Sequence, residues 1–537
     1  MTTPRKPPQS PDEPSILPRW MRLSARGKTI RNGLLWAIAM PIPFFLALMG
    51  TWIGSTLAIY HDGPVWLALI GALVVFAALP YLWELAVDAH QVGGRVRDAI
   101  LRSSFLSILL IAVLLLTHAK TTYVALATRG DWFLAESRTP AADSIRGFMF
   151  RMADRFQWLD TWTRDFSYAW AGTTEGVDPS SSAVALGSFL RSSAINANLK
   201  SRATKPEGFL IPGTTHRWPL PSGVHPLVML MPADVKTSYE SVAEYLKTNI
   251  PDEFMRAKAV HDFVASWVVY DHAGLLADTA FSNGHQSAAM VFKRRLGVCA
   301  GYANLTSAMG NAAGIETVVV SGPIRWNSDY GLMSAEDVEG GEFKLAAGDT
   351  RSHAWNAMKV NGHWHLVDTT WDKSDATRGV QSTYLFIPPE VMLADHFPDD
   401  SEWQLLTTPK TYGDWLRSPN LDPHAFLHGI RVLNHLRPVA KHTPTFRLEV
   451  ANPYHLDISV GLRDEKFASL RDVANAKVNG VTSVQSTLNK RCGIGANTEI
   501  TVIECTAPNQ RFAAHIWAKR PENGADVWLG QVSVEAP

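Results

Sequence analysis

The sequence is poor in charge and in cysteine. Charged residues make up 19% of its 537 residues, against about 25% in an ordinary soluble domain. The 50 basic and 50 acidic side chains give a formal net charge of zero. Nucleic-acid binders usually carry a basic excess or a basic stripe, so we expect no nucleic-acid partner. Three cysteines are too few for a disulfide-dense scaffold or a four-cysteine zinc module.

The shortage of charge is concentrated in three successive apolar runs. Residues 33–60 and 64–83 contain no charged side chain, and Glu84 comes directly after the second run. A third apolar run covers residues 103–116. A spanning helix needs about 20 apolar residues, whereas an export signal has an apolar region of about 7–15. We therefore expect three transmembrane helices within residues 33–120, acting as an uncleaved anchor. The alternatives are a buried hydrophobic hairpin, which three successive runs argue against, and a channel, which the lack of charge in the runs argues against.

Basic side chains set the expected orientation. The N-terminal tail, residues 1–32, carries seven of them, and the loop between the second and third runs carries Arg95, Arg97 and Arg102. The loop between the first two runs carries none. Because cytoplasmic loops are enriched in Lys and Arg, we expect a cytoplasmic tail. Three crossings then place everything after about residue 120 outside the cytoplasm, which is the periplasm in a Gram-negative bacterium.

The remaining chain divides by its patterns. A connecting region, 121–235, includes an amphipathic helical pattern over 143–170, with Ile145, Phe148, Met152, Phe156 and Leu159 at helical spacing. Two further helices are expected within 238–271, the second from about Glu253 to Trp267. A third helix is expected to begin near Cys299 and to stop at Gly314.

Strand patterns come after this helix. Strand-like runs cover 316–321, 354–360 and 363–368, and Asn361-Gly362 between the last two is a strong hairpin signal. Alternating apolar and polar residues then recur in FRLEV, LDISVGL, EITVIEC, AAHIWAK and VWLGQVSVE. Short strands at this spacing predict an all-β, sandwich-like C-terminal domain over 407–537.

One cysteine has the surroundings expected of a nucleophile. Cys299 is flanked by Gly297 and Gly301 and lies at the predicted start of a helix. The thiolate is the reactive form of cysteine, and the partial positive charge and free amides of a helix N-terminus favour it. Small neighbours also let the backbone of a substrate approach.

His353 and Asp368 lie at the same end of the predicted hairpin. His353 begins the run HAWNAMKV and Asp368 ends the partner run HWHLVD. Position 353 is eight residues before Asn361 and 368 is six after Gly362, so a bulge or a small register offset is needed. A carboxylate beside an imidazole fixes its tautomer, and the other ring nitrogen can take the proton of Cys299. The three residues predict a Cys-His-Asp site for acyl transfer.

Each of the three residues also has a purely structural interpretation. A lone cysteine among small residues is often a buried apolar group. A histidine at the start of a strand is commonly a hydrogen-bonded surface group, and an aspartate before Thr-Thr often caps a turn. The functional interpretation depends on their occurring together, in this order around a hairpin.

Two segments resemble the core of the transglutaminase-like superfamily. They are KRRLGVCAGYANLTSAMGNAAGIETVVVSG and SHAWNAMKVNGHWHLVDTTWD, which match the family pattern G-x-C-x-G, then H-A-W, then G-x-W-x-x-x-D-x-T. The upstream AKAVHDFVASWVVYD resembles the helix that precedes the cysteine. The later YLFIPPEVMLADHFPDDSEWQLL resembles the segment after the core in the kyphoscoliosis-peptidase-like branch. The resemblance covers about residues 240–406.

The resemblance implies a papain-like α+β catalytic domain over 236–406. In it Cys299 is the nucleophile, His353 the base and Asp368 the orienting acid. It implies a thioester acyl-enzyme acting on protein or peptide amides, by hydrolysis or by transfer to an amine. The same fold includes inactive scaffolds, so a membrane-tethered interaction protein is the alternative. Calcium-binding acidic clusters of animal enzymes are not apparent, so we expect no cofactor and no metal.

Several secondary candidates accompany the triad. Asp372 is the second candidate for the orienting acid. The backbone amide of Cys299 is the first candidate for an oxyanion donor, and Trp267 or Tyr270 is a weaker one. Cys299, His353, His363, His365 and Asp368 are residue types that bind zinc, but no Cys-x-x-Cys or His-Glu-x-x-His spacing supports a zinc site.

The remaining two cysteines are Cys492 and Cys505. If Cys299 stays a free thiol in an exported protein, these two can pair. Cys492 lies in the turn-like RCGIGAN and Cys505 ends the strand-like EITVIEC. A disulfide and two separate buried thiols both fit this pattern.

Overall fold

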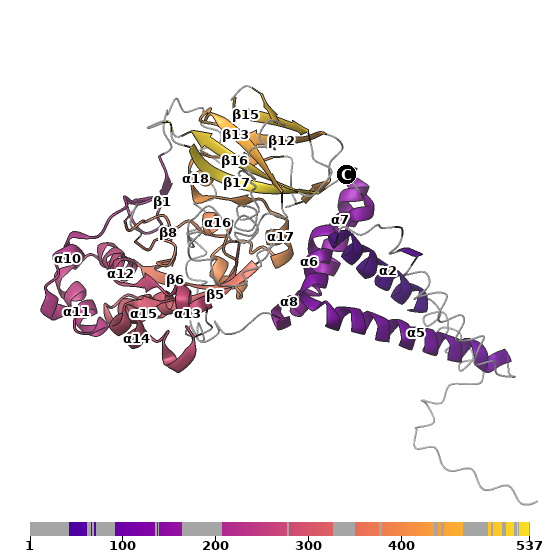
Figure 1. Cartoon of the computed structure of the whole chain (residues 1–537), viewed down its shortest axis with the longest axis horizontal. Helices are drawn as coiled ribbons and strands as arrows, with labels where there is room; N and C mark the ends of the chain where they lie inside the picture. The colour runs from indigo at the N-terminus through magenta and orange to yellow at the C-terminus, as the bar shows by residue number, and fades with distance from the viewer. Residues whose placement is uncertain are drawn as a thin grey trace, which may run out of the picture. The chain divides into compact units, whose positions relative to one another are not determined.

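The computed structural model describes the chain in separate segments (Figure 1). They are residues 42–61, 66, 69–70, 92–134, 137, 139–163, 207–276, 279–325, 350–374, 379–433, 439–441, 445–464, 492–495, 498–506, 512–519, 524 and 526–535. These segments belong to two compact units, 1–125 and 126–537. Each unit is described by itself.

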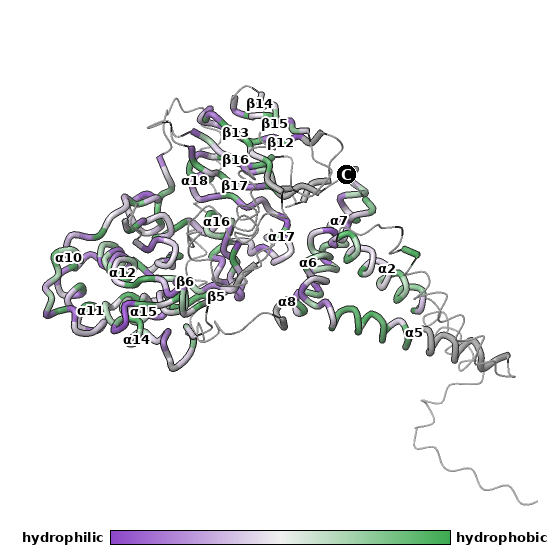
Figure 2. The backbone as a smooth tube through the Cα atoms, in the orientation of Figure 1, coloured by the Kyte–Doolittle hydropathy of each residue, from purple (hydrophilic) through white to green (hydrophobic). Residues whose placement is uncertain are grey.

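The first unit contains two apolar helices that contact each other, α2 (Ile42–Tyr60) and α5 (Val92–Thr117). Figure 2 shows the hydrophobic residues along the second half of α5. Among the described residues, α2 is the one helix that by length and composition could cross a membrane, with a mean hydropathy of 1.7. Within the described segments, a second candidate crossing requires that Ser104–Thr117 and Ala119–Leu134, which are bent by 98° at their junction, act as one span.

The prediction of three spanning helices is therefore supported for one helix, or two if the bent pair is counted. The predicted run 103–116 lies inside α5, but Arg95, Arg97 and Arg102 occupy the beginning of that helix. The chain then bends at His118 before α6 (Ala119–Arg129), so the apolar part of α5 is short. Most of the predicted run 64–83 lies outside the described residues.

The helix expected over 143–170 is interrupted. It consists of α7 (Pro140–Asp154) and α8 (Gln157–Thr163), and residues 164–170 lie outside the described residues. Thr139 caps α7 by accepting a hydrogen bond from the Ala142 amide. Two residues of the expected apolar face, Ile145 and Phe148, are 45% and 54% exposed.

The region around the predicted cysteine combines helices with a four-stranded antiparallel sheet. The sheet has the order β5-β6-β7-β8, and α12 and α15 pack against β6. A hydrophobic core of helix and sheet residues lies between them. The elements are β1 (Phe209–Leu210), β2 (Arg217–Trp218), α10 (Pro226–Met229), η6 (Ala233–Val235), α11 (Tyr239–Asn249), α12 (Glu253–Trp267), β3 (Val269–Tyr270), α13 (His272–Leu276), η7 (Ser282–Gly284), α14 (Ala288–Arg294), β4 (Leu296–Gly297), α15 (Cys299–Ala312), β5 (Thr317–Arg325), β6 (Thr350–Val360), β7 (His363–Val367), β8 (Leu385–Ile387), α16 (Pro389–Met392), η9 (Ser401–Gln404) and α17 (Tyr412–Arg417).

The local signals in this region are confirmed. Helix α12 has the predicted bounds, and α15 begins at Cys299 and is followed by Gly314 with φ of 78°. Asn361 and Gly362 have φ of 50° and 77°, which is the pair of positive values that a two-residue type I′ hairpin turn requires. The mixture of helix and sheet agrees with the α+β expectation.

The C-terminal residues form two sheets that share one core. One has the order β10-β12-β15-β14, and the other has the order β11-β17-β16-β13, with β9 paired to β17. Apolar residues of both sheets, such as Leu448 and Ile516, belong to the same buried cluster. The elements are β9 (Asn420–Leu421), α18 (Pro423–Leu427), β10 (Arg431–Val432), β11 (Val439–Lys441), β12 (Thr445–Ala451), β13 (Ile458–Asp464), β14 (Cys492–Ile494), β15 (Ile500–Thr506), β16 (Phe512–Lys519) and β17 (Asp526–Glu535).

Cys492 and Cys505 form a disulfide between neighbouring strands of the first of these sheets. They are directly opposite each other in β14 and β15. Of the two interpretations left open by the sequence, the structure contains the disulfide, and Cys299 is the free cysteine.

The disulfide predicts the thiol count of the purified protein. Denaturing alkylation should block one thiol before reduction and three after it, because only Cys299 is unpaired. Intact-mass spectrometry measures both numbers. Three blocked thiols in a freshly prepared, unreduced sample would rule the disulfide out.

Candidate active site

Cys299 follows a short parallel strand pair and is the first residue of α15. Strand β3 pairs with β4, which ends two residues before the cysteine. The Gln286 side chain accepts a hydrogen bond from the Val298 amide at 2.9 Å and donates to the Ala280 carbonyl at 2.7 Å. Gly301 is needed here, because a Cβ would lie 2.5 Å from Gln286 Oε1. The Cys299 thiol thus lies at the N-terminus of α15. The residue is buried, with 2% of its surface exposed.

The hairpin brings His353 and Asp368 together without a bulge between its strands. The regular register of β6 and β7 runs from Val360↔His363 to Asn356↔Val367. Continued by one residue, this register places Asp368 opposite Trp355, so His353 is its diagonal neighbour on the same face. The register offset expected from the sequence is therefore two residues, the separation between His353 and Trp355, and no bulge is needed. The irregularity of the sheet lies between β7 and β8 instead.

The Asp368 carboxylate is fully hydrogen-bonded. Its Oδ2 lies 2.7 Å from His353 Nε2, and its Oδ1 accepts from the amides of Thr370 at 2.8 Å and Trp371 at 3.2 Å. Cys299 lies close enough to His353 to raise the pKa of the imidazole together with Asp368. The structure therefore brings together all three residues predicted from the sequence.

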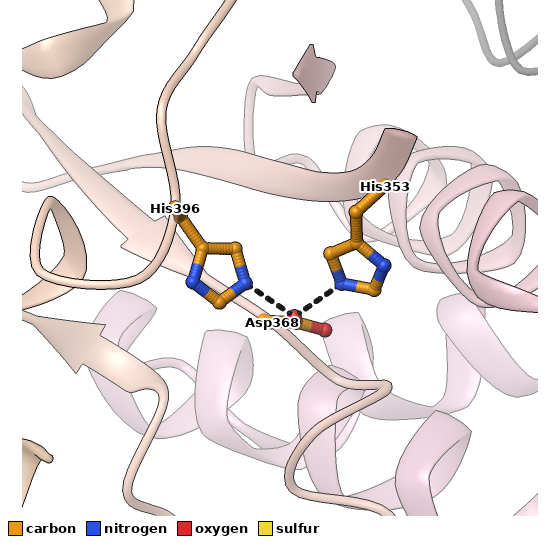
Figure 3. A group of neighbouring side chains, drawn as sticks. All are labelled: His353, Asp368 and His396. Carbon is orange, nitrogen blue, oxygen red and sulfur yellow. Dashed lines mark hydrogen bonds and ion pairs between the residues drawn. The ribbon is translucent and has the colours of Figure 1, made fainter. Parts of the chain in front are cut away.

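A second histidine joins this group, and sequence reasoning missed it. His396 Nε2 lies 3.1 Å from the same Asp368 Oδ2 (Figure 3). On its other side, His396 Nδ1 lies 2.5 Å from Asp395 Oδ1. The Tyr384 hydroxyl donates to Asp395 Oδ2 at 2.6 Å. The adjacent Asp-His pair in LADHFP was the available signal, but nothing in the sequence indicates that this segment returns to Asp368.

Electrostatics keep the site charged although it is buried. Burial is the largest influence on His353 and lowers its pKa, but Asp368 and Cys299 outweigh it and raise the pKa to about 9. Burial likewise opposes ionisation of Asp368, yet His353 and His396 together hold the pKa of Asp368 well below its usual range. The site thus favours a carboxylate with a protonated imidazole.

Asp372, the second candidate for the acid, does not face His353. Its carboxylate lies 3.2 Å from His261 Nε2 and accepts from the amides of Thr383 and Tyr384 at 2.9 and 2.8 Å. His261 Nδ1 in turn lies 2.9 Å from Asp262. His261 is therefore a second buried histidine between two aspartates, and it is not hydrogen-bonded to Asp368.

The weaker candidates are placed elsewhere or are already engaged. The Trp267 indole N–H donates to the Phe292 carbonyl at 3.0 Å, which commits its only polar hydrogen. His363 and His365 line an apolar cavity with Trp218 and Phe386. The five zinc-ligand types singled out from the sequence are therefore not gathered into one group.

The group that could hold a metal ion, among the described residues, is His353, Asp368 and His396, whose ligand atoms lie within 4.8 Å of one another. Tetrahedral zinc with bonds of about 2.0–2.1 Å separates its ligand atoms by roughly 3.3 Å. The 2.7 Å between His353 and Asp368 is a hydrogen-bond distance. Both histidines also have pKa values raised to about 9, which disfavours the lone pairs that a metal needs. Proton sharing fits this group better than a metal does.

Comparison with known proteins agrees with this geometry. The sequence profile of the transglutaminase-like superfamily matches residues 240–369. The chain contains a transglutaminase-like domain. Kyphoscoliosis peptidase of Mus musculus is 35% identical over 120 residues, and that of Homo sapiens is 34% identical over the same length. Each alignment covers 21% of this chain and 16% of the relative, so the likeness spans a small part of both proteins.

The solved structures that are similar include a protein described as "Crystal structure of a TGase". It is 17% identical and covers 34% of this chain and 37% of its own, with a TM-score of 0.18. A superposition with so low a score adds nothing to the argument. The family assignment depends on the profile and on the two peptidase alignments, and all three of Cys299, His353 and Asp368 lie inside the range that the profile matches.

The charge on His353 gives a prediction that needs no substrate. We expect the rate at which iodoacetamide alkylates native Cys299 to show an inflection near pH 9, where His353 loses its proton and the positive charge beside the thiol disappears. Asp368→Asn should move this inflection to lower pH, because the Asp368 charge raises the pKa of His353. His353→Ala should leave only the rise that follows ionisation of the thiol itself, and the difference between the two profiles assigns the inflection to His353. An inflection that Asp368→Asn leaves in place would contradict the electrostatic role of this carboxylate.

Proposed function

We propose that this protein is a membrane-anchored cysteine enzyme that cleaves protein or peptide amides through a thioester on Cys299. The observation that carries the proposal is the His353–Asp368 hydrogen bond of 2.7 Å beside a free cysteine at a helix N-terminus. Membership of the transglutaminase-like superfamily supports it. In this proposal Cys299 is the nucleophile, His353 the proton carrier and Asp368 the orienting acid.

In the first step the Cys299 thiolate attacks the carbonyl carbon of the amide. A carbon–sulfur bond forms, and the carbonyl oxygen takes the negative charge. The backbone N–H of Cys299, in the first turn of α15, has no acceptor within the helix and is the proposed donor to that oxygen. The carbon–nitrogen bond then breaks as protonated His353 gives its proton to the leaving amine.

In the second step an acceptor resolves the thioester. Water, or an amine in the transfer reaction, gives a proton to His353 and attacks the carbonyl carbon, and the carbon–sulfur bond breaks. The product is a carboxylic acid or a new amide, and the thiolate is regenerated. Similarity to the kyphoscoliosis peptidases favours water as the acceptor.

The second candidate function is a non-enzymatic scaffold. It would need the fold but not the charged site, and buried charges that do no chemistry are costly to retain. The presence of the complete buried group Cys299, His353 and Asp368 favours the enzyme.

The enzyme predicts a covalent intermediate. An activated ester such as p-nitrophenyl acetate should acetylate Cys299 and release about one equivalent of p-nitrophenol in a burst. Cys299→Ala and His353→Ala should remove the burst and all amide cleavage without unfolding the protein. Stopped-flow absorbance and intact mass measure both events. An unchanged burst in Cys299→Ala would remove the nucleophile assignment.

The same assay distinguishes the two aspartates. Asp368→Asn should retain partial activity, because orientation suffers more than nucleophilicity. Asp372→Asn should have the smaller effect, because Asp372 bonds to His261 and not to His353. A greater loss in Asp372→Asn would show that the orienting acid is assigned to the wrong residue.

The proposal includes the anchor and the domain order. Large apolar side chains such as Phe44, Phe45, Phe105 and Leu116 are exposed on α2 and α5, which suits contact with lipid. We propose a cytoplasmic tail (1–32), membrane helices within 33–120, a connecting region (121–235), a catalytic domain (236–406) and a sandwich-like domain (407–537). The basic residues of the tail support this orientation.

The proposed orientation can be tested with a fusion at Pro537. A reporter that is active only in an exported compartment should be active there, because the catalytic region is placed outside the cytoplasm. The matched fusion with a cytoplasmic reporter should be silent. The reverse pattern would place the catalytic region in the cytoplasm and show that one crossing was miscounted.

A further inference from the structure

Two histidines share one oxygen of Asp368. Oδ2 lies 2.7 Å from His353 Nε2 and 3.1 Å from His396 Nε2, and the two ring centroids are 5.4 Å apart (Figure 3). A single carboxylate carries one negative charge. The two imidazoles therefore compete for the same counter-ion, and the protonation of one opposes that of the other.

The bonds of His396 require protons on both of its ring nitrogens when its partners are ionised. Nδ1 faces Asp395 at 2.5 Å and Nε2 faces Asp368 at 3.1 Å. Ionised carboxylates only accept hydrogen bonds, and a neutral imidazole has a single N–H to give. Burial lowers the pKa of His396 most strongly, but Asp395 and Asp368 outweigh it and raise the pKa to about 9.

The backbone fixes His396 in this position. Residues 395–399 run antiparallel to β5, with the Arg325 amide donating to the Asp395 carbonyl at 2.8 Å and the Phe397 amide to the Pro323 carbonyl at 2.9 Å. Gly322 makes this approach possible, because a Cβ there would lie 2.0 Å from the Phe397 carbonyl oxygen. The backbone on both sides of His396 is thus hydrogen-bonded to β5, as it would be in a further strand of the sheet.

The surroundings of His396 suit a cation. Its ring lies nearly perpendicular or steeply inclined to those of Trp355 and Trp371, at centroid distances of 5.1 and 4.5 Å, and aromatic rings attract positive charge. The titratable groups that face the two histidines are Cys299, Asp368 and Asp395, with Tyr384 bonded to Asp395. Burial is the largest influence on Asp395 and raises its pKa, His396 and Tyr384 oppose this rise, and Asp422 adds to it.

We propose that His396, kept protonated by Asp395, is a positioning residue that takes part of the Asp368 charge away from His353 and so limits how tightly His353 holds its proton. The inference rests on the proposed cysteine chemistry, in which His353 must give its proton to the leaving amine. A group that holds a proton too strongly is a poor general acid near neutral pH. His396 therefore tunes the acid without touching the substrate.

Two variants test the proposal through the alkylation profile of Cys299. His396→Gln removes the positive charge and keeps an N–H for Asp368, and Asp395→Asn removes the anion that keeps His396 protonated. Both should move the inflection assigned to His353 to higher pH, by about 0.5–1 unit, because His353 no longer shares its counter-ion. This direction is opposite to that expected for Asp368→Asn. If His396→Gln does not fold, the isosteric Asp395→Asn carries the test.

A matched control is available in the other buried histidine. His261 is also completely buried between two aspartates, Asp262 and Asp372, but its ring nitrogens bond to these and not to Asp368. His261→Gln should leave the inflection in place. An inflection that stays or moves downward in both His396→Gln and Asp395→Asn, or that moves equally in His261→Gln, would overturn the proposal.

The same experiment separates this inference from the proposed function. A wild-type profile without an inflection would mean that Cys299 and His353 form no ion pair, and the cysteine chemistry itself would fail. A wild-type inflection that His396→Gln and Asp395→Asn leave unmoved would refute the role of His396 alone.

Discussion

The arrangement of the site depends on one carboxylate group, that of Asp368. Four hydrogen bonds end on it, two from histidine rings and two from the amides of Thr370 and Trp371. Three parts of the fold position the donors. The register of β6 and β7 places His353, the turn after β7 places the two amides, and the segment after α16 places His396. A shift of any one of these elements would leave a buried charge without a partner, and such a loss typically costs about 3–5 kcal/mol.

Alternating charges explain how so many ionised groups can be buried together. The Asp368 carboxylate lies between the rings of His353 and His396, so that one anion is adjacent to two cations. Desolvation is the largest influence on both histidines and on Asp368, and it opposes the charged form each time. Only the neighbouring charges reverse it. The site is therefore stable as a complete set and vulnerable to the removal of any one member.

Local signals could be predicted from the sequence, and long-range returns of the chain could not. The bounds of α12, the helix start at Cys299 and the Asn361-Gly362 turn depend on spacing, capping and turn chemistry, which act over a few residues. The pairing of His353 with Asp368 was predictable because a hairpin turn fixes which residues lie at its end. His396 was missed because its approach depends on Gly322 and on the edge of β5, which no local pattern reveals. The helix over 143–170 was predicted as continuous, because helical spacing does not show where packing interrupts a helix.

The pairing of Cys492 with Cys505 has a consequence for the chemistry of Cys299. The chain has three cysteines, and two of them are consumed by the disulfide. If an oxidant converts Cys299 to a sulfenic acid, the chain holds no resolving cysteine that could condense with it. Recovery of the reduced enzyme then requires a thiol supplied from outside. The oxidation state of the nucleophile is thereby coupled to the reductants of its compartment rather than to the rest of the protein.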